Sequence, residues 1–226
     1  MAVTYDATSS GSAKDTFNVS HTCTGSNGYL IVSLRTSDAT DISGVTYDSV
    51  SMTQLASVGS STSNRHIVYG LVGPSTGANN ITVTFSTAGK IYDTHCRGSS
   101  FANVDQTTPL GTVVTSSGTS NDPNVTITTT TDDMGWCGAS TNDTIGSMTI
   151  GSGTSIYLND TANSTTGWQA ASYQLATGAS LAMDFDYSVS ADWWSVGVPL
   201  LQHVPVTVFQ QHSYRIRLDD GGLGAP

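Results

Sequence analysis

The sequence predicts an all-β protein, an antiparallel β-sandwich with an extended arm at its C-terminal end. Two observations lead to this prediction. Of the 226 residues, 66 are Ser or Thr, 17 are Asp and none is Glu, so the residues that usually build helix surfaces are scarce. Apolar residues also alternate with polar ones at two-residue spacing in many segments, which is the pattern of half-buried strands.

Six segments show this alternation clearly, and each is expected to form a strand with one apolar face. Their apolar rows are Leu30, Val32 and Leu34; Ile67, Tyr69 and Leu71; Ile81, Val83 and Phe85; Val125 and Ile127; Leu181, Met183, Phe185, Tyr187 and Val189; and Trp194, Val196, Val198 and Leu200. Weaker strand patterns cover residues 16–21, 45–47, 52–55, 90–101, 110–115, 135–139, 154–158 and 168–174. Gly, Asn, Asp and Pro clusters separate these segments as turns, and no strong internal repeat is evident.

The composition divides the chain near Pro205. Residues 1–203 are long enough for one large all-β domain, which closes with the apolar row that ends at Leu200. Residues 204–226 are predicted to be an arm or strand that docks onto another subunit. Within it, Tyr214, Ile216 and Leu218 alternate with Arg215 and Arg217, the pattern of a strand that could add to the sheet edge of a neighbour. The alternative is a disordered terminus.

The formal net charge of −10 excludes some partners. An acidic surface repels phosphate, so binding to nucleic acid or to anionic membranes is not expected. No apolar stretch of the sequence approaches the length of a membrane span, so membrane insertion is not expected either. The first residues lack the basic and apolar regions of a signal peptide, which would suit a virion protein that assembles inside its host cell. The three cysteines are expected to be buried free thiols, although one disulfide is possible.

Few residues point to catalysis or to a cofactor. A glycosidase commonly uses a Glu, and no GxSxG motif is present for a serine hydrolase. His95 is flanked by strand residues and is expected to be structural. Asp184 and Asp186 lie two residues apart and should share one face of a strand, where they could bind Ca²⁺ or simply solvate the surface. We expect no enzyme activity and no cofactor other than Ca²⁺.

The tryptophans suggest a possible ligand site. Adjacent residues of a strand point to opposite faces, so Trp193 should be exposed if Trp194 belongs to the core. Exposed aromatic rings stack on sugars, which makes Trp193 and Trp168 candidates for glycan binding. Contact with another subunit is the alternative for the same rings.

Several segments, taken in order, match a known pattern: Met1–Asp6, Ser20–Asn27, Gly44–Thr53, Gly77–Thr84, Phe101–Pro109 and Trp194–Val198. Together they resemble a jelly-roll or concanavalin-like domain of phage structural proteins and bacterial surface proteins. The resemblance covers about residues 1–203 and implies no catalytic residues. It implies a virion structural protein, such as a phage head decoration, fibre or tail-surface subunit, with itself and other virion proteins as partners. The alternatives are an extracellular or cell-surface adhesive module that binds glycans, and a subunit of an extracellular filament linked by its arm.

Overall fold

The computed structural model describes residues 1–36, 42–59, 64–86, 94–141, 145–151, 153–157 and 167–204, the side chains of residues 154–157 excepted. These residues form seventeen β-strands in four antiparallel sheets and no helix, which confirms the predicted all-β sandwich. None of the described segments is therefore a helix long and apolar enough to cross a membrane. Residues 205–226, which are all of the predicted docking arm except Val204, lie outside the described residues.

The strands β1–β9 form a first sandwich of two sheets. Their bounds are β1 Thr4–Ala13, β2 Phe17–Cys23, β3 Tyr29–Thr36, β4 Ile42–Tyr47, β5 Val50–Ser51, β6 Thr53–Gly59, β7 Arg65–Val72, β8 Gly77–Phe85 and β9 Thr94–Ala102. One sheet has the order β1-β9-β3-β7-β6, and the other has the order β2-β8-β4-β5. Most consecutive strands switch between the two sheets, whereas β4 pairs with β5 and β6 pairs with β7 within one sheet.

The strands β10–β17 form a second sandwich. Their bounds are β10 Val114–Ser120, β11 Asn124–Thr128, β12 Met134–Thr141, β13 Met148–Ile150, β14 Thr154–Tyr157, β15 Trp168–Leu175, β16 Ser180–Tyr187 and β17 Ala191–Leu200. The sheets have the orders β10-β17-β12-β15-β14 and β11-β16-β13. The linker between the sandwiches pairs with the end of β17 through the bridges Val104 to Gln202 and Leu110 to Leu200.

The two sandwiches are a structural repeat. The order β1-β9-β3-β7-β6 matches β10-β17-β12-β15-β14 strand for strand, and β2-β8-β4 matches β11-β16-β13. The register agrees as well, because β3 pairs with β7 from Tyr29–Val72 to Thr36–Arg65 and β12 pairs with β15 from Met134–Leu175 to Thr141–Trp168. The sequence shows no strong internal repeat, so this repeat is evident only from the strand topology. Only the strand β5 has no counterpart among the described residues of the second sandwich.

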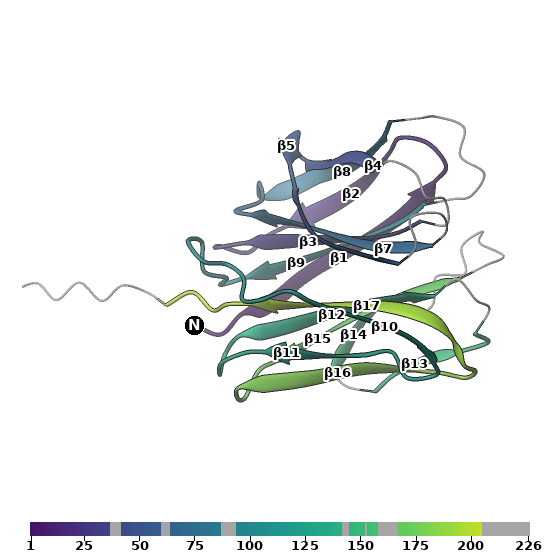
Figure 1. Ribbon diagram of the computed structural model, residues 1–226. Coiled ribbons are helices and arrows are strands. Elements are labelled where there is room, and N and C mark those ends of the chain that lie inside the picture. Colours follow the sequence, from purple (N-terminus) through teal and green to yellow (C-terminus); the bar gives the residue numbers. More distant parts are fainter. Residues whose placement is uncertain are drawn as a thin grey trace, which may run out of the picture.

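The four sheets stack as four layers (Figure 1). The two five-stranded sheets, which we call the inner sheets, face each other, and the smaller outer sheets cover them on either side. Each sandwich has its own apolar core, and a third core, which includes Ile31, Phe101, Trp136 and Val198, joins the inner sheets. The central strands β3, β9 and β12 of the inner sheets are therefore buried on both faces.

This stacking explains why some residues that the alternating pattern places on the polar face are nevertheless buried. Leu30, Val32 and Leu34 face the first core as predicted, but Ser33 and Arg35 on the opposite face are also buried, since the second sandwich covers them. In β16 the predicted apolar row is buried as far as Tyr187. Val189, expected in the same row, lies in the following turn and is 49% exposed.

The contact between the inner sheets repeats with the two sandwiches exchanged. Ser33 and Gly138 occupy equivalent positions, as do His66 and Gln169, according to the shared register. Gln169 Nε2 donates to Ser33 Oγ at 2.7 Å. Reciprocally, a Cβ placed on Gly138 would lie 2.9 Å from His66 Nε2. One contact made twice in this way is the mark of an approximate two-fold relation.

Candidate functional site

Three carboxylates gather on the exposed face of the second outer sheet. Asp184 and Asp186 lie on the outward side of β16, opposite Asn124 of β11 and Thr149 of β13. Asp122 joins them from the turn before β11, and one oxygen of each carboxylate lies within 4.8 Å of the others. The shared strand face of Asp184 and Asp186 was predicted, whereas Asp122 was not. We call these three residues the acidic cluster.

Backbone hydrogen bonds hold the acidic cluster in place. Phe185 N donates to Pro123 O at 2.9 Å and Tyr187 N donates to Asn121 O at 2.7 Å, so the turn that carries Asp122 is tied directly to β16. Gly151 N donates to Asp184 O at 3.1 Å. A side chain at Gly151 would collide with the Asp184 carboxylate, so the glycine leaves room for it.

The acidic cluster has the chemistry of a partial cation site. Carboxylate oxygens are suitable Ca²⁺ ligands, but Ca²⁺ takes six to eight oxygens and three carboxylates supply only part of such a shell. Asp122 and Asp186 are exposed and Asp184 is half-buried, so water could supply the remaining ligands. Without a cation, three negative charges this close repel one another. The arrangement therefore favours any positively charged group that approaches this face.

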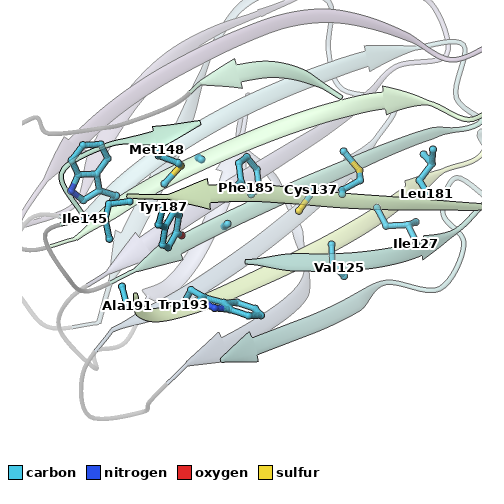
Figure 2. Close-up of a cluster of buried hydrophobic side chains, with 14 of the residues drawn as sticks. Val125, Ile127, Cys137, Ile145, Met148, Leu181, Phe185, Tyr187, Ala191 and Trp193 are labelled. Atoms are coloured by element: carbon cyan, nitrogen blue, oxygen red, sulfur yellow. The ribbon is translucent and has the colours of Figure 1, made fainter. Parts of the chain in front are cut away.

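The tryptophans predicted as glycan-stacking residues are both buried. Trp193 is 5% exposed and Trp168 is 6% exposed, and both belong to the core of the second sandwich. Figure 2 shows Trp193 among the other side chains of this core. The expectation that Trp193 is exposed is wrong, because both faces of β17 are covered. Trp193 Nε1 donates to Ser120 Oγ at 2.9 Å, and Gly118 on the neighbouring strand leaves room for the ring. Trp194 is half-buried on the face toward the first sandwich.

A second cluster of polar side chains lies between the inner sheets. We call it the buried polar layer, and its members are Ser33, Arg35, His66, Ser140 and Gln169. Ser33 Oγ accepts from Gln169 and lies 3.1 Å from His66 Nε2. Ser33 Oγ is therefore shared between Gln169 and His66, and the direction of its bond to the imidazole depends on the tautomer of the ring. Burial, together with the nearby Arg35 charge, lowers the pKa of His66 to about 3, so the ring is neutral at ordinary pH.

Arg35 is the charged member of the buried polar layer and is 1% exposed. Its Nε donates to Thr141 O at 3.0 Å and one terminal nitrogen donates to Asn64 Oδ1 at 3.2 Å. Burial lowers the pKa of Arg35 to about 10. Gly167, which has a φ of +97°, passes so close that any side chain there would collide with the guanidinium. These contacts make the buried polar layer a structural junction between the sandwiches.

A Ser–His–Asp set in the first sandwich deserves comparison with a hydrolase triad. His21 Nδ1 lies 2.9 Å from Ser9 Oγ, and Asp6 is close enough to His21 to influence its pKa. Burial lowers the pKa of His21, and the Asp6 charge offsets only part of that effect. The Asp6 carboxylate accepts from Thr24 N at 3.0 Å and from Ser100 Oγ at 2.8 Å. A triad carboxylate instead orients the histidine, so these bonds indicate a structural role.

The remaining predicted residues are placed as follows. His95 is buried within β9, at 1% exposure. Cys23, Cys96 and Cys137 are free and buried, which confirms the expected free thiols, and burial raises the pKa of the Cys96 thiol to about 12. Such thiols are poor nucleophiles at neutral pH. Tyr214, Arg215, Ile216, Arg217 and Leu218 lie outside the described residues.

The fold and its surface define an antiparallel β-sandwich protein with an acidic outer face. No protein-family model matches the chain, and no curated protein matches it either.

Proposed function

We propose that this protein is a non-enzymatic structural subunit of a virion, in the class of phage head decorations, fibres and tail-surface proteins. It acts through self-association and through contacts with other virion proteins. The observation that carries the proposal is the stack of two repeated sandwiches joined by their inner sheets. Three apolar cores and the buried polar layer hold the four layers together. Close packing of this kind resists deformation, which a structural subunit of a particle requires.

The surface chemistry fits the same role. The net charge of −10 keeps copies soluble and disfavours binding to the packaged nucleic acid. The Ser9, His21 and Asp6 set found in the structure holds strands together, and the cysteines are buried. The proposed location is the virion.

Jelly rolls also occur in lectins, so a glycan-binding surface module is the alternative. The burial of Trp168 and Trp193 removes the rings that led to that hypothesis. A glycan array separates the two roles. Specific glycan binding, kept at moderate salt and lost on substitution of exposed residues, would favour the adhesive module over the virion subunit.

The direct test is the composition of native particles. Virions purified on a density gradient should contain the chain in a fixed copy number relative to the major capsid protein. Immunogold labelling should place it at symmetric positions on the head or tail. Recovery of the chain only as a free monomer, separate from particles, would refute the virion role.

A further inference from the structure

We propose that residues 213–218 of one copy add as a strand to the free edge of β13 in a neighbouring copy. This inference rests on the proposed role in assembly and names the acceptor for the arm. The two sandwiches differ at this edge. In the first sandwich β5 covers the edge of β4, where Thr46 pairs with Ser51 and Met52 N donates to Val45 O at 2.9 Å. Among the described residues of the second sandwich, the equivalent strand β13 pairs only with β16.

Among the residues that the structure describes, none pairs its backbone with the edge of β13 that faces away from β16. Ser188 N donates to Ser147 O at 3.0 Å and Gly151 N donates to Asp184 O at 3.1 Å, so alternate residues of this strand direct their backbone groups at β16. The N–H and C=O groups of Met148 and Ile150 therefore point to the opposite, free side. Strand addition pairs such groups with the backbone of an incoming segment.

The side chains along this edge match the alternation of the arm. On the inner face Met148 is buried and Ile150 packs against the core of the second sandwich, so an added strand would extend the core there. Val189, 49% exposed, lies just beyond Tyr187, the partner of Met148. Tyr214, Ile216 and Leu218 have the period needed to cover this apolar face.

The outer face of the same sheet supplies charge complementarity. Thr149 is exposed and pairs with Asp186, which belongs to the acidic cluster with Asp122 and Asp184. If the apolar residues of the arm face inward, Arg215 and Arg217 face outward on the side of the acidic cluster. Long guanidinium side chains can reach past the short Thr149 side chain toward these carboxylates.

The position of the chain end selects a second copy as the partner. Val204 follows the C-terminal end of β17 in the chain, whereas Tyr187, the partner of Met148, shortly precedes the N-terminal end of β17 at Ala191. Figure 1 accordingly shows β13 near the end of β17 that is far from its C-terminal end. β17 alone spans about 30 Å, and packed sheets lie about 10 Å apart. Ten residue steps from Val204 to Tyr214 reach at most about 36 Å, so a copy's own arm would have to be fully stretched. Docking in trans avoids this and links copies head to tail, as rings or filaments.

A mixing experiment on the complete chain tests this directly. One variant lacks residues 205–226 and keeps the β13 edge. The other keeps the arm and carries Thr149→Lys with Asp186→Lys, which makes the acceptor basic. Analytical ultracentrifugation should show each variant alone as a monomer and the mixture as a 1:1 heterodimer. Wild-type protein should form larger, concentration-dependent oligomers.

Charge variants of the arm give the second measurement. Arg215→Glu with Arg217→Glu should weaken self-association about tenfold or more at low salt, whereas Lys14→Glu, a charge change at an exposed distant site, should not weaken it. A wild-type chain that stays monomeric, or oligomers that persist without residues 205–226, would overturn the strand addition. Particle composition would still test the virion role separately.

Discussion

His66 should make the stability of this protein depend strongly on pH. The ring is fully buried between the sandwiches, and burial lowers its pKa to about 3. In the unfolded chain a histidine has a pKa of about 6.5. Between about pH 3 and pH 6.5, His66 is therefore protonated in the unfolded state and neutral in the folded state. Stability contributed by the neutral ring is complete above about pH 6.5 and is lost progressively as the pH falls toward 3.

The magnitude follows from the size of the pKa shift. A difference of about 3.5 pKa units corresponds to roughly 5 kcal/mol between pH 7 and pH 3, of which about 2 kcal/mol is lost by pH 5. His66→Gln removes the titrating group and installs the residue found at the equivalent position of the second sandwich, Gln169. The variant should lose about 1 kcal/mol at pH 7 and be less sensitive to acid than the wild type.

The assay is urea denaturation followed by tryptophan fluorescence at half-unit intervals from pH 7.5 to pH 4.5. Other groups titrate equally in both proteins, so the difference between the two stability curves isolates His66. Below pH 6, the wild-type free energy of unfolding should fall by about 1.4 kcal/mol per pH unit more than that of the variant. Parallel curves would refute the burial of a neutral His66 between the sandwiches.

Four further predictions concern the contacts described above. Ser33→Ala should destabilise the fold by about 2 kcal/mol in urea titrations, because His66 and Gln169 lose their shared partner; a loss below about 0.5 kcal/mol would contradict that contact. Trp193→Ala should cost about 3–5 kcal/mol by the same measurement, and an unchanged stability would mean that the ring is not a core residue. Asp186→Asn should raise stability by about 0.5 kcal/mol at low salt and by less in 1 M NaCl, whereas Asp48→Asn, an exposed control in the other sandwich, should change little. Millimolar Ca²⁺ should raise the thermal midpoint of the wild type more than that of Asp186→Asn, and equal responses would exclude the acidic cluster as the binding site.

Local alternation was sufficient to predict the fold class, because a two-residue period reports directly on a half-buried strand. It was weakest where burial is not one-sided. In β17 both Trp193 and Trp194 pack against other parts of the protein. The rule that one of two adjacent strand residues is exposed therefore led to the wrong prediction that Trp193 is exposed. The strand β1 was not predicted at all, since Thr4–Ala13 contains few large apolar residues and gains its order by pairing with β9.

The other features that the sequence analysis missed depend on pairing between strands that are far apart in the sequence. Asp184 and Asp186 could be placed on one strand face from their spacing, but Asp122 joins them only because β11 pairs with β16. The repeat was hidden because its equivalent positions carry different residues, such as His66 and Gln169. One trace in the sequence is the Thr-Gly-Ala segment that occurs at both 76–78 and 177–179, at the turns that lead into β8 and β16.

The central claim is that a rigid stack of two sandwiches serves as a subunit of a symmetric particle. Electron cryomicroscopy of the native particle tests this claim most directly. The maps should show symmetric copies of the four-layer body on the head or tail, with an extra strand from a neighbour beside β13. Particles whose surface proteins leave no density for this body would contradict the claim.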